Sequence, residues 1–555
     1  MTKTADYSNP PHRDPGSKED DATGLIRASR TMAFGTLVSR GTGFLRTALV
    51  ASVIGVAIGD AYNLANTLPN IVYELLLGGV LTSVVVPLLV AGARQGDDED
   101  AYAQRLLTLV AIALGAASIA AIVLAPWIVR LYSLFGTGGL PKPEMALATL
   151  FARFFLPQIF FYGMGALMGA ILNTRGRFGP PMWAPVLNNL VVIVTAVVFL
   201  VITHHTPQAG ALSVTQRLVL SIGTTLGIVA QTVALIPALR AARFRLRPRW
   251  DWRGVGLGRA ARLASWVFIY VLANQIGYLV IINLASTVQF GISSYTYAFI
   301  LFSLPHAIVA VSVITALLPR MSRSALAGRL DAVSSDLARG LKLAATVLIP
   351  AELLLLALGP LLATVVFAHF NLTLSSARFV GYVLTGFAAC LVPFSIFQLQ
   401  LRAFYALHDT RTPALINIAV NAVNISADLM FFLLLHGRAR IVGLAIGYAL
   451  SYIFGAVVFT ILLRRRIGSA RGAYVKRTYA RLSAAALPAV GVAWLAAWGI
   501  TSVSGKGWLS ALAALCVAGL VAGVIFVKAA TRMKVGEVRM MFASVRGRVS
   551  HRARS

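Results

Sequence analysis

Charged residues and cysteines are both scarce in this chain of 555 residues. Only 12% of the residues are Asp, Glu, Lys or Arg, roughly half the share found in a typical soluble domain. Cys390 and Cys516 both fall in apolar stretches, so a disulfide framework or a cysteine metal site is excluded. The eight histidines lack zinc-ligand spacing, and no nucleophile elbow or phosphate-binding loop occurs. The sequence therefore points away from a soluble enzyme, and we predict no catalytic residues.

Apolar residues dominate the chain instead. They make up 58% of it, and the mean hydropathy is +0.78. Apolar runs of the ~20 residues needed to span a bilayer recur along the whole length. We count about fourteen of them, centred at roughly residues 45, 80, 118, 160, 192, 225, 275, 305, 353, 390, 422, 450, 490 and 520. The sequence therefore predicts an all-α integral membrane protein with about 14 transmembrane helices.

The net charge of +30 is distributed unevenly between alternate loops. If the N-terminus is cytoplasmic, the inner loops and tails hold about 38 of the 49 Lys and Arg residues. This bias predicts a multi-pass protein of the cell membrane with both termini and the Arg240–Arg262 loop inside, and with His204 and His205 outside. The basic loops and tail are expected to contact anionic membrane lipids, and we expect no nucleic acid partner.

An internal repeat organises the apolar runs. Four sets of matching residues are separated by the same 236 positions (393 − 157): Pro157 and Pro393, Asn173-Thr174-Arg175 and Asp409-Thr410-Arg411, Leu68-Pro69 and Leu304-Pro305, Gly55 and Gly291. A common spacing in several motifs indicates two homologous halves of six helices each. An even helix number makes the repeats parallel, and transporters of this kind bind substrate between the halves.

The repeat and the charge pattern together predict the domain boundaries. We predict a disordered cytoplasmic tail at 1–29, an N-terminal six-helix half at 30–245, a C-terminal six-helix half with its preceding basic loop at 246–466, two extra transmembrane helices at 467–531, and a basic cytoplasmic tail at 532–555.

Two arginines lie inside the first membrane-length segment, which runs from Met32 to Ile58. A cation near the bilayer centre costs about 2.5–3.5 kcal/mol, so such residues usually face a polar cavity. The planar fork of arginine suits phosphate. Arg40 and Arg46 therefore predict an anion-binding cavity, with snorkelling and helix-end packing as the alternative. Because they are about 240° apart on a straight helix, we expect a bend at Gly41 and Gly43.

A polar stripe marks the helix near residue 422. Asn417, Asn421, Asn424 and Asp428 lie on one helical face in an apolar segment. Oxygen ligands of this kind suit a hard cation such as Na⁺. The alternative is a set of hydrogen bonds between neighbouring helices. The residues alone leave both interpretations open.

Two motifs resemble those of the MurJ (MviN) flippase family. They are Ser39-Arg40-x-x-Gly43-Phe44-x-Arg46 followed by Asp60-Ala61-x-x-x-Ala65-x-x-x-Pro69-Asn70, and Leu172-Asn173-Thr174-Arg175 followed by Phe178-Gly179-Pro180-Pro181-x-Trp183-Ala184-Pro185. The resemblance covers about residues 30–530 and is greatest to the actinobacterial branch. It implies the multidrug/oligosaccharidyl-lipid/polysaccharide exporter superfamily and transport of lipid II, the undecaprenyl-diphosphate-linked precursor, from the inner to the outer leaflet by alternating access for cell-wall synthesis and cell shape.

The resemblance also implies residue roles. It assigns substrate binding to Arg40, Arg46 and Asp60, and to Glu74, which takes the place of the family's usual acid near Gly78. It implies no cofactor, with Na⁺ as a coupling ion held by Asn424 and Asp428, and with Asn274 or Asn283 as further ligands. Members often carry Asp-Arg where this chain has Phe299-Ile300, so we expect the N-terminal half to bind the diphosphate.

Other functions remain as alternatives. A flippase for another polyprenyl-linked glycan or a drug/cation antiporter of the same superfamily would share the fold. A polyprenyl-phosphate glycosyltransferase, a remote alternative, would need carboxylates in outer loops, where Asp60 is the candidate in the first such loop. Beyond lipid II and anionic lipids, the expected partners are cell-wall synthesis proteins.

Overall fold

The computed structural model describes residues 15–75, 99–132, 140–203, 207–250, 257–468, 472–505 and 507–538, and contains no strand in these ranges. The helices in chain order are α1 (Pro15–Leu75), α3 (Glu99–Leu131), α4 (Lys142–Phe155), α5 (Gln158–Thr174), α6 (Gly179–Ile202), α7 (Val214–Val233), α8 (Leu235–Ala241), α9 (Leu257–Ala285), α10 (Gly291–Leu326), α11 (Leu330–Phe367), α12 (Leu374–Ala388), α13 (Leu391–Ala406), α14 (Arg411–Leu434), α15 (Ala439–Ile467), α16 (Gly472–Ser504) and α17 (Trp508–Arg532). The predicted all-α class is confirmed.

The helices are long and apolar enough for a membrane protein. Within the described ranges, 12 helices could cross a bilayer, or up to 13 if the bent pair α12 and α13 forms one span. The apolar run predicted near residue 80 lies outside the described residues. The total of about fourteen spans therefore stays a prediction.

The helix α1 contains the first predicted membrane segment, Met32–Ile58, and turns sharply at Gly55 (φ 65°, ψ −159°). A Cβ atom at Gly55 would lie 2.7 Å from the Asn371 carbonyl oxygen. The repeat-related Gly291 is equally confined, because a Cβ there would lie 2.2 Å from the Ala285 oxygen. Only glycine fits such close backbone approaches. The repeat thus marks a tight turn between α9 and α10 that matches the turn inside α1.

Two expectations about α1 are not met. The helix begins at Pro15, within the segment 1–29 that we predicted to be disordered. Proline suits the first helical turn, where its missing N–H costs nothing. The bend expected at Gly41 and Gly43 is wrong, because Gly55 is the one residue of α1 with non-helical backbone angles.

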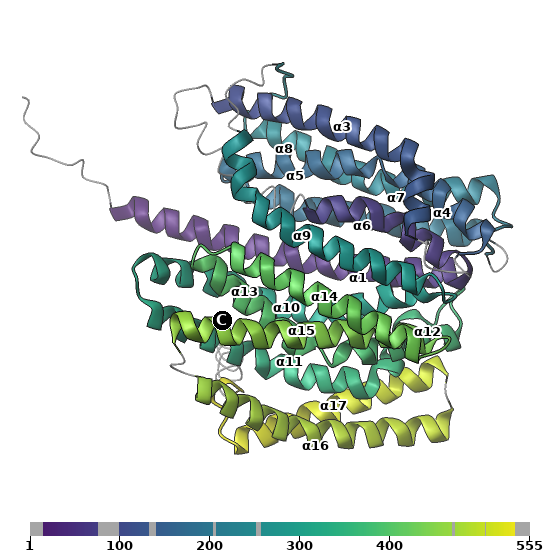
Figure 1. The fold of residues 1–555 in the computed structure, drawn as a ribbon, viewed down its shortest axis with the longest axis vertical. Coiled ribbons are helices and arrows are strands. Elements are labelled where there is room, and N and C mark those ends of the chain that lie inside the picture. The colour runs from purple at the N-terminus through teal and green to yellow at the C-terminus, as the bar shows by residue number, and fades with distance from the viewer. Residues whose placement is uncertain are drawn as a thin grey trace, which may run out of the picture.

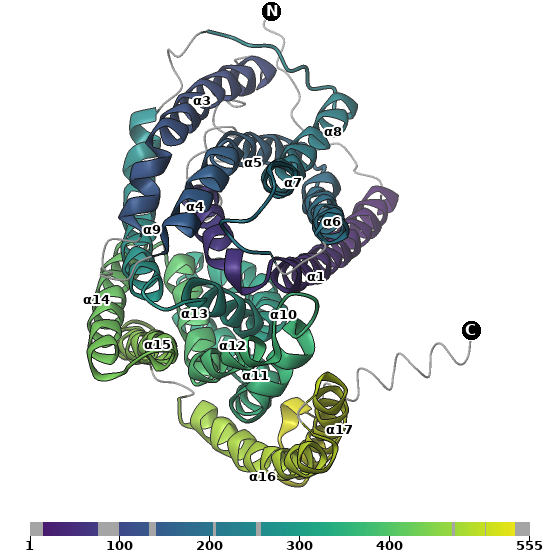
Figure 2. The ribbon, with the colours of Figure 1, turned by 90° about the vertical axis from the view of Figure 1, so that its right-hand side faces the viewer.

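The helices form two groups and a pair at one edge (Figures 1 and 2). We call α1 and α3–α8 the N-terminal group, and α9–α15 the C-terminal group. Figure 2 shows α4 to α7 on one side of α1 and α10 to α13 on the other. The extra helices α16 and α17 pack against α11 at the outer edge of the C-terminal group. The predicted boundaries at 245 and 466 themselves stay predictions.

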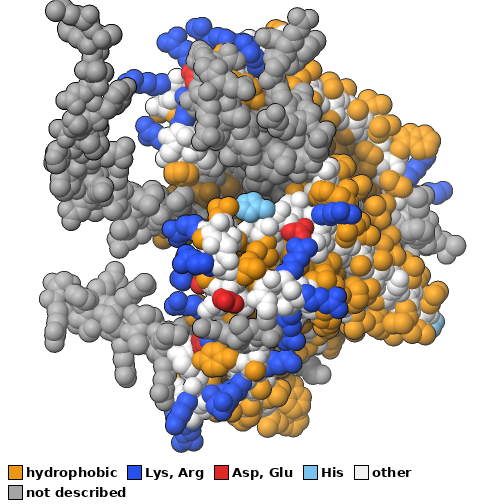
Figure 3. All heavy atoms as spheres, turned by 60° about the vertical axis from the view of Figure 1, so that its left-hand side comes forward, with side chains coloured by type: hydrophobic (Ala, Val, Ile, Leu, Met, Phe, Trp, Pro, Cys, Tyr) orange, Lys and Arg blue, Asp and Glu red, His pale blue; other side chains and the backbone are white. Residues whose placement is uncertain are grey.

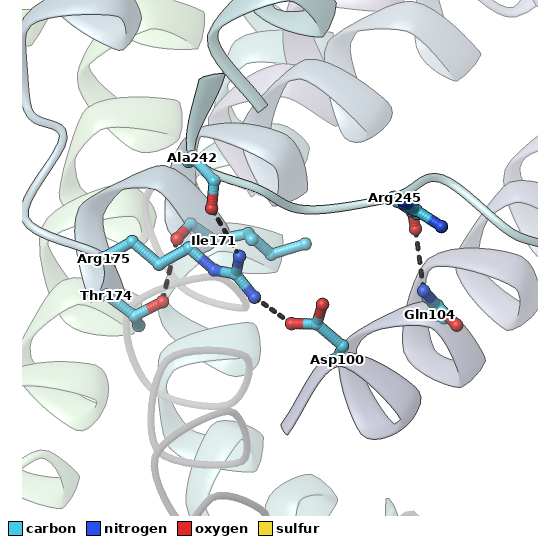
Figure 4. Close-up of polar contacts among 7 residues, drawn as sticks. All are labelled: Asp100, Gln104, Ile171, Thr174, Arg175, Ala242 and Arg245. Atoms are coloured by element: carbon cyan, nitrogen blue, oxygen red, sulfur yellow. Dashed lines mark hydrogen bonds and ion pairs between the residues drawn. The ribbon is translucent and has the colours of Figure 1, made fainter. Parts of the chain in front are cut away.

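Each of the repeated segments Asn173-Thr174-Arg175 and Asp409-Thr410-Arg411 contributes one residue to an ion pair within its own group. In the N-terminal group, Arg175 pairs with Asp100 and donates to the Ala242 carbonyl at 2.9 Å (Figure 4). In the C-terminal group, Arg466 pairs with Asp409. Burial would raise the pKa of Asp409, but hydrogen bonds from Thr412 and Arg466 outweigh it and lower that pKa. These contacts tie helix ends together, so each group is braced internally.

Basic side chains gather on one end of the molecule, next to a broad hydrophobic belt (Figure 3). Several helices carry arginine in their last turn, namely Arg240 of α8, Arg323 of α10, Arg464, Arg465 and Arg466 of α15, and Arg532 of α17. A basic end beside an apolar belt is the surface expected of a protein whose cytoplasmic loops are positively charged.

Candidate functional site

Two adjacent hollows with polar side chains in their linings lie where the helix groups meet. The first, which we call the arginine pocket, has a volume of about 150 Å³ and is lined by Arg46, Tyr62, Gln158, Asn188 and neighbouring residues. The second, which we call the amide–aromatic cavity, has a volume of about 420 Å³ and is lined from both groups. The two hollows are neighbours, because both linings contain the same five residues: Asn63, Asn66, Asn70, Thr296 and Ile300.

The arginine pocket combines a cation with hydrogen-bonding side chains. Arg46 is half-buried there and has no ion pair with a described acidic residue. Tyr62 Oη lies 2.9 Å from Thr224 Oγ1, and Gln158 Nε2 donates to Thr225 Oγ1 at 3.0 Å. The Gln158 oxygen is buried without a hydrogen-bond partner. A free guanidinium in a confined polar pocket is suited to binding an anion.

Arg40 does not share this pocket with Arg46. It is half-buried and absent from the described lining of both hollows. The reason is geometric, since α1 is unbroken between the two arginines and six residues separate them by about 240°.

Asp60 lies in a contact between the helix groups rather than in either pocket lining. Asp60 Oδ1 accepts a hydrogen bond from the Ser293 backbone N–H at 2.8 Å. One turn along α1, Asn63 Nδ2 donates to Ser293 Oγ and to Tyr297 Oη, each at 3.0 Å. Asp60 is 2% exposed, so α1 and α10 enclose it. The side chain of Glu74 lies outside the described residues.

Further hydrogen bonds join the groups at the same end of the molecule, near Gly55. The backbone N–H of Asn371 donates to the Ser52 carbonyl at 2.9 Å, and Asn371 Nδ2 donates to the Val53 carbonyl at 2.7 Å. Asn283 Nδ2 of α9 donates to the Leu131 carbonyl of α3 at 2.9 Å. We call this set, with Asp60 and Asn63, the outer clamp. It holds the two groups together at the end that the charge pattern predicts to be external.

The proposed Na⁺ ligands are divided between different surroundings. Asn424 Nδ2 donates to Asp428 Oδ2 at 2.9 Å, so these two side chains are adjacent. Asn274 of α9 faces a different part of α14, where its oxygen accepts from Asn417 and Asn421, each at 3.0 Å. Asn283 belongs to the outer clamp. The described residues contain no group of three or more His, Cys, Asp and Glu side chains that could hold a metal ion.

Asp428 is nevertheless unusual. It is 0% exposed, and its Oδ1 atom has no hydrogen-bond partner. A Cβ atom at Gly447 of α15 would lie only 2.2 Å from this oxygen, so the absence of a side chain there makes room for it. A carboxyl group in such surroundings needs a proton or a cation to offset its desolvation.

Sequence reasoning missed the amides and aromatic rings of the cavity. Asn63, Asn66 and Asn70 follow i, i+3, i+7 spacing on α1, and Tyr448 and Tyr452 follow i, i+4 spacing on α15. Both spacings place their residues on one helix face. This periodicity was visible in the sequence and could have identified these side chains as a cavity wall.

A helical membrane protein with two helix groups around a polar cavity has the architecture of a transporter. The fold is similar to the solved structure of lipid II flippase MurJ in an inward closed conformation (TM-score 0.70, 20% identity), which covers 89% of this chain and 97% of that one. It is also similar to an inward-facing multidrug resistance MATE family transporter of the MOP superfamily (TM-score 0.64, 17% identity), over 79% of this chain and 96% of that one.

Sequence comparison gives the family. The model of the family "Lipid II flippase MurJ" matches residues 50–518, and the chain therefore belongs to this family. The probable lipid II flippase MurJ of Vibrio cholerae is 28% identical over 420 residues, covering 73% of this chain and 77% of the relative. The lipid II flippase MurJ of Burkholderia cenocepacia is 28% identical over 449 residues, covering 80% and 84%. The family resemblance of the sequence motifs is confirmed.

Proposed function

We propose that this chain moves lipid II across the cell membrane, and that it is a transporter rather than an enzyme. Family membership carries the proposal, and the arginine pocket supports it, because a diphosphate needs a cation in the cavity that it crosses. The direct test is replacement of a known lipid II flippase by this chain in depleted cells. Restored growth and cell shape are expected. Transport of a drug or of a different polyprenyl-linked glycan instead would reject lipid II as the substrate.

The route that we propose is alternating access between the two helix groups. The outer clamp keeps the groups together at the predicted external end, which supports entry of the headgroup from the cytoplasmic side. Opening the clamp would require breaking several buried hydrogen bonds, and binding of the substrate must favour that state for it to become populated. Internal bracing by the Arg175 and Arg466 ion pairs supports movement of each group as a unit.

We propose further that a cation binds at Asp428 and biases this equilibrium. The buried, unpartnered Oδ1 atom and the adjacent Asn424 amide support a Na⁺ site. For Asn274, Asn417 and Asn421, the alternative to a Na⁺ site is a set of hydrogen bonds between α9 and α14. The contacts of Asn274 with the other two residues favour this alternative.

Substituting Asp428→Asn should remove the Na⁺ dependence of transport while the protein stays folded. The amide keeps the shape of the side chain but removes the charge that a cation would offset. Flipping by purified protein in vesicles, measured across a Na⁺ series, gives the result. Asn417→Ala serves as the control, because it alters the stripe without touching Asp428. Unchanged Na⁺ dependence in Asp428→Asn would contradict the cation site.

We also propose that both termini are cytoplasmic, that the basic end of the molecule contacts anionic lipid headgroups, and that cell-wall synthesis proteins are partners. The gathering of Lys and Arg on one end supports the first two (Figure 3). In a variant without Cys390 and Cys516, Trp250→Cys should resist an impermeant thiol reagent in intact cells and react after permeabilisation. Gln208→Cys, in the predicted external loop, should react in intact cells. The reverse pattern would invert the topology.

A further inference from the structure

The two adjacent hollows differ in charge. Arg46 lines the arginine pocket, whereas the described lining of the amide–aromatic cavity contains no Asp, Glu, Lys, Arg or His. At their shared boundary lies Ile300, an apolar residue. An anion placed in the cavity would lose hydration without gaining a cation. The cavity is therefore suited to a neutral ligand beside an anionic one.

Polar atoms in the cavity are available for such a ligand. Asn66, half-buried on α1, lines both hollows and makes no hydrogen bond with a described residue. Gln275 of α9 lines the cavity from the opposite group, and its side-chain oxygen is buried without a partner. A buried oxygen without a partner favours a ligand that can donate a hydrogen bond. Side-chain amides offer both donors and acceptors, as hydroxyl groups require.

Aromatic rings line the cavity from α10 and α15. Tyr448 and Tyr452 of α15 are in contact, with ring centroids 4.7 Å apart, and Phe299 meets Tyr448 edge to face at 5.7 Å. All three are half-buried and line the cavity. Aromatic faces offer broad apolar contact at fixed positions because few torsions remain free. The C–H faces of a sugar ring match such a surface, while its hydroxyl groups match the amides.

We propose that the amide–aromatic cavity is a sugar-binding subsite, and that it holds glycan units of the substrate while Arg46 holds the diphosphate. The cavity volume of about 420 Å³ lies within the range of ordinary small-ligand pockets. Adjacency of the two hollows, which share Asn66 and Asn70 in their linings, matches the covalent order of a sugar joined to a diphosphate. This assignment rests on the proposed function and adds to it the part of the headgroup that each hollow recognises.

Two ligands distinguish binding in the arginine pocket from binding in the amide–aromatic cavity. Undecaprenyl diphosphate carries the anion without sugars, and lipid II carries both. Binding of each to the purified full-length chain in lipid nanodiscs should show that sugars increase the affinity. Gln275→Ala, at a residue that lines the amide–aromatic cavity but is absent from the described lining of the arginine pocket, should weaken lipid II binding about fivefold, the typical effect of losing one hydrogen bond. Tyr448→Leu should weaken it by about two- to tenfold through loss of the aromatic face. Neither variant should change the affinity for undecaprenyl diphosphate.

Two controls make the test specific. Tyr382→Leu removes a tyrosine that is 55% exposed on α12 and should leave both affinities unchanged. Arg46→Ala should weaken both ligands, because both carry the diphosphate. Equal loss of both ligands in Gln275→Ala and Tyr448→Leu, or no loss of lipid II in either, would overturn the sugar subsite while leaving the proposed function intact. Failure of the wild-type chain to bind either lipid would overturn the proposed function itself.

Discussion

Arg46→Ala should lose nearly all flipping activity while the protein remains folded. Arg46 lines the arginine pocket and has no ion pair with a described acidic residue, so among the described residues its removal leaves no acidic partner behind. Hydrogen bonds to charged groups are worth about 1.5–3 kcal/mol, which corresponds to about a tenfold to hundredfold loss of affinity. Flipping of lipid II in proteoliposomes measures the effect, with thermal unfolding as the check on folding.

Two further substitutions sharpen this prediction. Arg46→Lys should restore activity only in part, because an ammonium lacks the planar fork that donates two parallel hydrogen bonds. Arg40→Ala should have a smaller effect than Arg46→Ala, because Arg40 is absent from the described lining of the pocket. An Arg46→Ala variant with wild-type affinity for lipid II would show that this arginine serves packing or topology instead.

The features that the sequence predicted well depend on local properties. Hydropathy reports the preference of each segment for lipid, so the helical membrane class followed from composition and run length. Repeated spacing indicates internal duplication, and the 236-residue offset identified Gly55 and Gly291 as equivalent positions in the two halves. Their backbone confinement explains why a glycine recurs, since any side chain would meet the Asn371 or Ala285 carbonyl.

The features that the sequence predicted poorly depend on how each helix is rotated about its axis and on which helices pack against each other. Nothing near Asp60 in the sequence identifies Ser293, because 233 positions separate them. Asn283 was grouped with Asp428 by residue type, yet its amide donates to α3. For Arg40, the helical angle already indicated divergence from Arg46, and the bend introduced to bring the two together is absent from α1. The sequence therefore does not give the neighbouring helix that each side chain faces.

Asp60→Ala should weaken the outer clamp and expose the cavity to the outside. The substitution leaves the Ser293 backbone N–H buried without its acceptor, at a cost of about 1–3 kcal/mol. Because the clamp exists only in the outward-closed state, this cost should favour opening by about fivefold to a hundredfold. The expected consequence is impaired flipping, because a transporter that cannot hold its outward-closed state cannot complete the cycle of alternating access.

Accessibility of the cavity measures the clamp directly. In the variant lacking Cys390 and Cys516, a cysteine at Thr296, which lines both hollows, should react faster with an impermeant reagent in intact cells when Asp60→Ala is added. Asp60→Asn is the matched control, because an amide oxygen can still accept from Ser293 N–H at nearly the same position. It should react more slowly than Asp60→Ala. If both variants label at the wild-type rate, Asp60 does not control closure, and its burial between α1 and α10 would then serve assembly of the two helix groups alone.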